Sequence, residues 1–259
     1  PESFIKAYKK FVNTGWFSII GEKKYGGQNL PLSAVVMINE IWHSTNMSFA
    51  TNNMLTQGAV ELLESHGNEK QKEYYLPNLI SGKWSGTMNL TEPHAGSDLS
   101  LIKTKAIEKD KQFLIKGTKI YITHGDQDMS DNIIHLVLAK LPNAPDGVKG
   151  ISLFLVPKYY LNDKGTKVKN DIKVVSVEHK LGHHASPTCV LSFGENEGAV
   201  GELVGEPNQG LKAMFTMMNN ARLNVGVQGL AISERAYQKA LNFSKERIQG
   251  YSLNKNITG

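Results

Sequence analysis

The sequence has 259 residues, of which 40% are hydrophobic and 20% charged, and its mean hydropathy is −0.30. This length and balance suit one large globular domain or two to three smaller ones, and they exclude a disordered chain. The net charge of +5 comes from scattered Lys and Arg residues with no run of five or more, which gives no sign of a nucleic-acid groove.

The cysteine content and the apolar runs limit the compartment. The single cysteine, Cys189, excludes an internal disulfide framework and suits a reducing cytoplasm, where we expect the protein to act. A membrane span needs roughly 18 consecutive apolar residues, and neither such a run nor a signal peptide is visible. The sequence begins without Met and ends at Asn-Ile-Thr-Gly, which we interpret as a fragment of a longer protein.

Residues 1–82 have a helical pattern. A long helix is predicted to begin at Pro31, to be interrupted by a loop near 45–49, and to stop at Gly67. Asn68 then has the side chain of an N-cap for the helix EKQKEYYLPNLISG.

From Lys83 to about Phe193 the pattern changes to strands. The predicted strands are β-branched or alternating runs bounded by Gly, Pro, Asn and Asp: FLIKGTKIYIT, NIIHLVLAKL, GISLFLVP, KVVSVEH and TCVLSF. A helical period returns at Gly210 and ends around Gly250. Its predicted apolar face contains Met214, Met218, Ala221, Val225, Gly229, Ile232, Ala236, Ala240 and Phe243.

This order of elements predicts an α+β fold: helices, then a β unit of six or more strands, then a long helix. Doubly wound folds alternate strands and helices, so a parallel nucleotide-binding sheet is disfavoured. The sequence also lacks G-x-G-x-x-G and P-loop motifs. Any nucleotide cofactor must therefore be held by something other than a Rossmann turn.

The segment MNLTEPHAGSDL places several chain-breaking residues between two strand-like runs. Thr91 offers a hydroxyl at a strand end, where it can reach the polar edge of a ring. Gly96 permits close approach, and Ser97 with the neighbouring N–H groups can form an anion nest for a phosphate. The alternative interpretation is an ordinary surface turn.

The segment KIYITHG contains a second candidate pair. Tyr121 and Thr123 are two residues apart, so they point to the same face of a strand. An aromatic ring beside a hydroxyl suits a flat heteroaromatic ligand, which the ring can stack on and the hydroxyl can bond. An ordinary half-buried strand is the alternative here.

Together these segments resemble a known family, the flavin-dependent acyl-CoA dehydrogenases. The resemblance covers almost the whole chain and rests on the segments YLPNLISGKW, LTEPHAGSDL, KGTKIYITHGDQD, GISLFLVP, EHKLGHHASPTCVLSF, VGEPNQGLKAMFTMMNNAR and KERIQG. The stretches DNIIHLVLAKLPNAPDGVKGISLFLVPK and MMNNARLNVGVQGLA most resemble the branch typified by 3-methylmercaptopropionyl-CoA dehydrogenase.

The resemblance implies three domains. Residues 1–82 would form part of an N-terminal helical domain, and residues 83–200 a central antiparallel β-barrel-like domain that binds FAD and acyl-CoA. Residues 201–259 would begin a C-terminal helical bundle. This order agrees with the segmentation seen in the sequence patterns.

The resemblance also implies a set of FAD-binding residues. Leu90 and Thr91 would lie at the pyrimidine edge of the flavin, and Thr123 would donate to flavin N5. Tyr121 replaces the Trp usual beside the flavin, and Arg247 matches an arginine that reaches the FAD of a neighbouring subunit. The full set is Met88, Leu90, Thr91, Gly96, Ser97, Tyr121, Ile122, Thr123 and Arg247.

For the acyl-CoA substrate, the resemblance implies contacts from Ser97, Asn219 and Arg222. Most family members take their catalytic Glu from far into the C-terminal domain, and some from the residue before the matched arginine. That residue is Ala221 here, so no catalytic residue is expected in this chain and the base is predicted beyond Gly259.

Other candidate residues have simpler interpretations. His179, His183 and His184 lie in a predicted loop without carboxylate or Cys ligands at metal spacing, so no metal site is predicted. Glu92 is interpreted as a buried carboxylate that accepts loop N–H bonds, and Cys189 as core. The methionines 214, 217 and 218 are predicted to pack in a helix interior.

The sequence thus predicts an enzyme of fatty acid metabolism that desaturates an acyl-CoA thioester. Hydride would pass to flavin N5 and the α proton to a Glu outside this chain, and the fragment itself would be inactive. Expected partners are acyl-CoA, an electron-transfer flavoprotein or similar acceptor, and further copies in a homodimer or homotetramer, with no nucleic acid and no membrane span. The alternatives are a DNA-associated alkylation-response flavoprotein of the same superfamily and an inactive scaffold.

Overall fold

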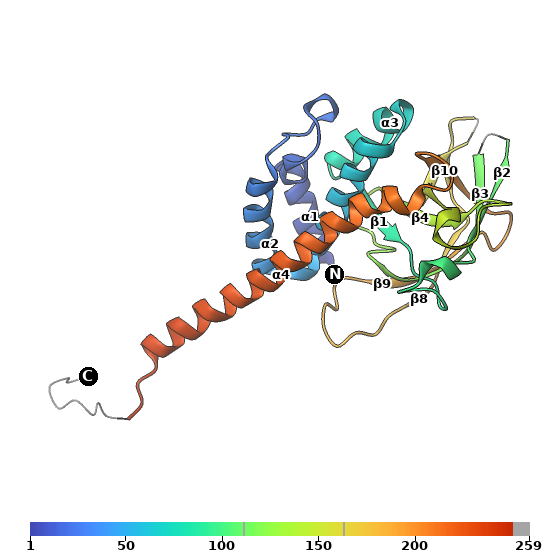
Figure 1. The fold of residues 1–259 in the computed structure, drawn as a ribbon. Helices are drawn as coiled ribbons and strands as arrows, with labels where there is room; N and C mark the ends of the chain where they lie inside the picture. Colours follow the sequence, from blue (N-terminus) through green and yellow to red (C-terminus); the bar gives the residue numbers. More distant parts are fainter. Residues whose placement is uncertain (111, 163, 251–259) are drawn as a thin grey trace.

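The computed structural model describes residues 1–110, 112–162 and 164–250. Figure 1 shows the helices α1, α2 and α3 gathered beside a β-sheet, with the long helix α4 running across both and projecting beyond them. The helices are α1 (Glu2–Asn13), α2 (Leu32–His66), α3 (Glu69–Ile80) and α4 (Gly210–Glu246), with short 3-10 segments at Trp16–Ile19, Lys23–Tyr25, Leu99–Leu101 and Gly147–Gly150.

Within the described residues, the strands form one eight-stranded sheet and one small hairpin. The hairpin pairs β6 (Tyr159–Leu161) with β7 (Lys167–Lys169). The main sheet contains β1 (Trp84–Asn89), β2 (Lys105–Lys109), β3 (Gln112–Thr123), β4 (Asn132–Lys140), β5 (Ile151–Pro157), β8 (Ile172–Val177), β9 (Thr188–Phe193) and β10 (Ala199–Val204).

The α+β class is confirmed, but the expected barrel is not closed. The strands follow the order β1-β4-β5-β10-β3-β9-β8, and β2 pairs with β3 and β4 off this path. Most neighbours are antiparallel, whereas β1 runs parallel to β4. Burial on both faces of the sheet explains the unbroken apolar runs in the sequence. Every residue of β5 is buried, and its side chains contribute to the core clusters on the two faces.

The helix α2 is interrupted within the predicted range 45–49, but by one non-helical residue and not by a loop. The break is confined to Asn46, which has φ −153° and ψ 95°. Its Oδ1 accepts a hydrogen bond from the N–H of Phe49 at 3.1 Å and so caps the second part of the helix. A single kink residue therefore replaces a loop.

The helix α3 begins as predicted. Asn68 Oδ1 accepts from the backbone N–H of Gln71 at 3.0 Å, and Gln71 Oε1 accepts from the N–H of Asn68 at 3.1 Å. This reciprocal capping box satisfies two N–H groups that the first helical turn leaves free. It fixes where α3 starts after the turn that follows α2.

The first half of α4 packs in the core, and its second half projects from the body (Figure 1). Met214 and Met217 are fully buried and Met218 packs against the same cluster, which confirms their predicted role. The predicted apolar face fails further along, where Val225, Ile232 and Phe243 are exposed, and the helix ends at Glu246. Within the described ranges, no helix is long and apolar enough to cross a membrane.

Candidate functional site

The two segments that the sequence singled out lie side by side. The chain leaves β1 at Asn89 and passes along the second half of β3, where the N–H of Ile120 donates to the Thr91 carbonyl at 2.9 Å. The Lys119 ammonium donates to the Leu90 carbonyl, also at 2.9 Å. Residues nearly 30 positions apart therefore form one surface, on which Thr91 and Thr123 are both half-buried.

A β-bulge shapes this part of β3. The pairing with β9 shifts between Lys119 and Ile122, and Tyr121 has φ +60°. The side chain of Ile122 is buried in the core, whereas the Tyr121 ring is 61% exposed. A bulky residue in the left-handed region is costly, and such strain is typical of sites where function requires a particular side-chain direction.

A buried ion pair fastens the loop after β1 to this bulge. Lys119 Nζ lies 2.8 Å from Glu92 Oε1, and their side chains are 0% and 2% exposed. Glu92 also accepts hydrogen bonds from the N–H of Lys103 at 2.7 Å, and from the N–H and hydroxyl of Thr104 at 3.0 and 2.6 Å. This pairing satisfies a carboxylate that would otherwise be very costly to bury.

The same contacts set the protonation of the pair. Burial alone would raise the pKa of the Glu92 carboxyl, but the Lys119 ammonium and the hydrogen bonds from Lys103 and Thr104 hold the pKa below its ordinary value. Burial lowers the pKa of Lys119 to about 8, against the opposing effect of Glu92. The interpretation of Glu92 as a loop-bonded structural carboxylate is confirmed by these hydrogen bonds.

The rest of the loop is a tight turn against the same surface. Glu92 and Ala95 exchange backbone hydrogen bonds at 2.8 and 3.1 Å. A Cβ on Gly96 would lie 3.4 Å from the Thr91 methyl group, so Gly96 sits directly against Thr91. Ser97 follows on the exposed side of the turn.

The candidate residues on α4 are divided into two places. Arg222 donates to Asn219 Oδ1 at 3.0 Å, so these two are together on an exposed face. Arg247 is at the far end of the helix, roughly 37 Å along the axis from Arg222 at 1.5 Å per residue. Within this chain Arg247 therefore stays apart from the other candidates. Ala221, beside Arg222, carries no ionisable group.

Two further groups of candidates lie elsewhere. Cys189 is a free, fully buried cysteine in β9, and burial raises the pKa of its thiol. The candidate metal ligands His179, His183 and His184 lie in the segment that joins β8 and β9. Across the described residues, no group of three His, Cys, Asp or Glu side chains is placed to hold a metal ion.

The surface formed by β3 and the β1 exit fits a flat cofactor with polar ring edges. The Tyr121 ring is exposed in a strained backbone conformation, and Thr91 and Thr123 are half-buried on the two segments that the Ile120–Thr91 bond joins. The side chain of Ile122 points into the core, so only its backbone can serve a ligand. The Met88 and Leu90 side chains are half-buried at the edge of the helical core cluster.

Sequence reasoning missed Lys119, the residue that fastens the loop to the strand. Its signal was available, because Lys119 occupies an inward position of the alternating strand that also buries Ile115. A lysine at such a position requires a buried anion, and Glu92 was the acidic residue already assigned to the interior.

Family models match most of this structure. Residues 2–83 match the acyl-CoA dehydrogenase N-terminal domain, and residues 87–195 match the acyl-CoA dehydrogenase middle domain. The chain belongs to the acyl-CoA dehydrogenase family. FAD is the cofactor of this family.

Individual relatives agree with this assignment. Over 251 residues the chain is 50% identical to 3-methylmercaptopropionyl-CoA dehydrogenase of Ruegeria pomeroyi, covering 96% of this chain and 42% of that protein. A chain in a structure described as electron transferring flavoprotein of Acidaminococcus fermentans has TM-score 0.80 and 28% identity, over 96% of this chain and 63% of that one. An acyl-CoA dehydrogenase complexed with FAD from Bacillus anthracis has TM-score 0.79 and 25% identity, over 96% and 41%. The chain thus spans less than half the length of that curated relative.

Proposed function

We propose that the whole protein dehydrogenates an acyl-CoA thioester between its α and β carbons, and that this chain supplies one wall of its FAD site. The observation that carries the proposal is the backbone bond between Ile120 and Thr91, which joins the two ring-binding segments into one surface. The name of the Ruegeria pomeroyi relative supports an acyl-CoA substrate.

Each residue of this wall has a proposed role. Thr91 hydrogen-bonds the pyrimidine edge of the ring, Thr123 donates its hydroxyl to N5, and the exposed Tyr121 ring lies against the flavin. Gly96 and Ser97 present backbone and hydroxyl donors to the pyrophosphate, and Ser97 also serves the acyl-CoA. Met88, Leu90 and the backbone of Ile122 complete the wall.

The reaction also needs a base for the α proton. When bound, FAD supplies the acceptor for the hydride that leaves the β carbon. The carboxylate of Glu92 is occupied by Lys119, Lys103 and Thr104, so it is not free to take a proton. Ala221 has no ionisable group, and we therefore assign the base to a Glu outside these 259 residues.

The remaining assignments concern partners. Asn219 and Arg222 lie together and are proposed to contact the CoA arm, and Arg247 to reach the FAD of a neighbouring subunit. We propose an electron-transfer flavoprotein as the acceptor, a homodimer or homotetramer as the assembly, and the cytoplasm as the compartment. The relatives named above give the nucleic-acid alternative no support.

The test uses the full-length protein. Purified enzyme saturated with FAD is mixed anaerobically with short-, medium- and branched-chain acyl-CoAs while flavin absorbance is followed. Bleaching by at least one thioester, with a matching 2-enoyl-CoA found by mass spectrometry, is the expected result. Bound FAD that no acyl-CoA bleaches would favour the inactive scaffold instead.

A further inference from the structure

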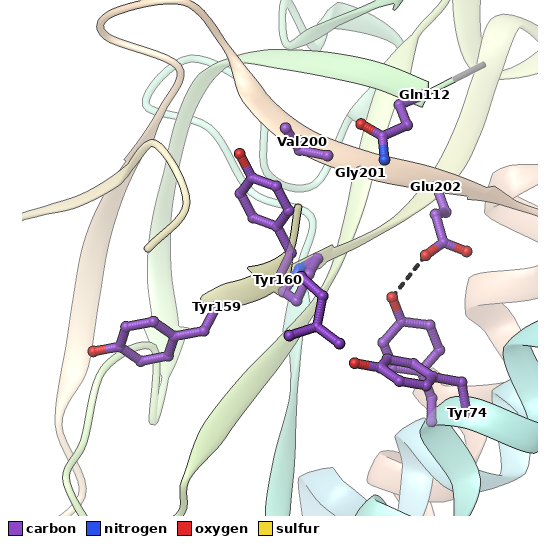
Figure 2. A pocket seen from close by; sticks show the side chains of 10 residues that line it. Tyr74, Gln112, Tyr159, Tyr160, Val200, Gly201 and Glu202 are labelled. Carbon is purple, nitrogen blue, oxygen red and sulfur yellow. Dashed lines mark hydrogen bonds between the residues drawn. The ribbon is translucent and has the colours of Figure 1, made fainter. Parts of the chain in front are cut away.

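A pocket of about 230 Å³ lies between α3 and the strands β6 and β10 (Figure 2). It has an unusual lining of tyrosines around one carboxylate. Figure 2 shows Tyr74 and Glu202 on one side and Tyr160 on the other, with Gln112 at the rim. Neither the sequence patterns nor the family resemblance pointed to this pocket.

The pocket is separate from the proposed flavin wall. Gln112 is at the first position of β3 and Tyr121 is near the last. Nine residues of strand at about 3.3 Å each place them roughly 30 Å apart. The two sites share no lining residue, so one can be tested without the other.

Glu202 brings a negative charge that the chain does not neutralise. Its carboxylate accepts hydrogen bonds from the Tyr75 hydroxyl at 2.7 Å and from Gln71 Nε2 at 3.3 Å. In the part of the chain that the structure describes, no Lys, Arg or His nitrogen lies within 4.0 Å of it. Burial, and then the charge of Glu202, raise the pKa of Tyr75, so Tyr75 remains a neutral donor.

The aromatic rings around Glu202 favour a cationic ligand. The faces of tyrosine rings attract cations, most strongly where water is partly excluded. The neighbouring Tyr159 shows this preference, since the ammonium groups of Lys167 and Lys158 lie 4.6 and 5.7 Å from its ring centre. Figure 2 shows the Tyr159 ring directed away from Glu202, which leaves Tyr74 and Tyr160 for a ligand.

We propose that this pocket binds the methylated ammonium group of a small organic cation. Both carboxylate oxygens already accept a hydrogen bond, so the site offers charge and ring faces with few free acceptors. A quaternary ammonium needs no acceptor, whereas an arginine-type guanidinium has five N–H donors to satisfy. The volume is below the 300 Å³ or more of drug-sized sites, which suits a head group of this size.

The probe is choline, titrated into the 259-residue chain by isothermal calorimetry, with the tyrosine resonances followed by NMR. The reference ligand is 3,3-dimethyl-1-butanol, which has the same shape without the charge, and guanidinium chloride is the competing cation. Sodium chloride is held constant throughout. We expect choline to bind saturably and about tenfold or more tighter than the neutral alcohol.

Two variants and two controls locate the binding. Glu202→Gln keeps an acceptor for Tyr75 and removes the charge, and Tyr160→Leu removes a ring face from the hairpin. Each is expected to weaken choline about tenfold. The exposed Glu197→Gln and Tyr237→Leu variants, which change the same residue types outside the pocket, should leave it unchanged.

Any of several outcomes would overturn the proposal. These are no saturable binding of choline, equal affinity for the uncharged alcohol, tighter binding of guanidinium, or choline affinity unchanged in both Glu202→Gln and Tyr160→Leu. The circular dichroism spectrum of each variant is compared with the parent, and the Tyr160 variant remains informative if the Glu202 variant is unstable. None of these results depends on FAD.

Discussion

Tyr121 shows how a single residue changes the course of β3. In a regular strand, the alternation would continue unbroken from Lys119, which is fully buried. The bulge inserts an extra residue, and Tyr121 accommodates it with φ +60° while Ile122 stays in the core. The exposure of the Tyr121 ring is a consequence of this local break.

Thr123 is predicted to matter more for reduction than for FAD retention. Thr123→Val in the full-length enzyme removes one neutral hydrogen bond, worth about 0.5–1.5 kcal/mol, or roughly two- to tenfold in rate. Stopped-flow flavin reduction and the FAD content after dialysis are measured together, with Thr118→Val on the same strand as control. A Thr123→Val enzyme that reduces its flavin at the parental rate would refute the N5 assignment.

His135 makes the stability of the chain depend on pH. Burial lowers its pKa to about 3, and its Nδ1 is bonded to the Thr87 hydroxyl at 2.7 Å. Because the folded pKa is below the unfolded value of about 6.5, only the unfolded chain takes up the proton as pH falls. The stability that the neutral His135 contributes is present above pH 6.5 and is lost as the pH falls toward 3. Between pH 7 and pH 5 the unfolding free energy should fall by about 2 kcal/mol from this group.

Urea denaturation of the parent and of His135→Gln at pH 7 and pH 5 measures this contribution. The difference between the two unfolding free energies should be about 2 kcal/mol smaller in the variant. His184→Gln, in an exposed segment, is the control and should retain the parental difference. His43 and His124, whose pKa values burial lowers to about 4, remain in all three proteins.

At the scale of elements, the Lys119–Glu92 pair joins β3 to the loop after β1. Lys119→Met leaves the Glu92 carboxylate buried without its cation, which should cost about 3–5 kcal/mol of unfolding free energy. Lys119→Met with Glu92→Leu removes both charges, and we expect it to be less destabilised than Lys119→Met alone. Chemical denaturation compares the parent, Lys119→Met, Glu92→Leu and the double variant. If the two single losses simply add in the double variant, the two side chains are not coupled.

At the scale of the whole molecule, the proposed assignment gives this chain only part of an FAD site. The wall on β3 and the β1 exit is present, but Arg247 lies at the projecting end of α4 (Figure 1). We therefore expect the 259-residue chain to hold FAD weakly and to purify colourless or faintly yellow. Stoichiometric FAD that survives gel filtration would contradict this expectation.

The same chain is also predicted to be catalytically silent. Without a base, proton abstraction is slowed by about two to four orders of magnitude, before any loss from missing pocket walls. Mixing the chain with FAD and a panel of acyl-CoAs under anaerobic conditions should therefore leave the flavin oxidised. Substantial bleaching that disappears in Glu92→Gln would overturn both the missing base and the structural role of Glu92.

The sequence by itself determined the features that depend on neighbouring residues. The capping box at Asn68 is formed within four residues, and the apolar runs of β4 and β5 report burial on both faces wherever the strands lie. The residues around Thr91 and Tyr121 could also be chosen as candidates for a ligand site, because their residue types suggest hydrogen bonding and ring stacking. The α+β class followed from the order of the elements, and the family fold from the resemblance that the motifs carry.

Only the tertiary structure decided the features that depend on distant partners. Pairing with β9 creates the bulge at Tyr121, and packing on α2 selects which side of α4 is buried, so Val225 and Ile232 are exposed despite their period. The open edge of the sheet and the partners of Lys119 and Glu202 likewise join segments far apart in the chain. Local periodicity indicates which face of a helix or strand is apolar. Long-range packing decides which groups contact that face.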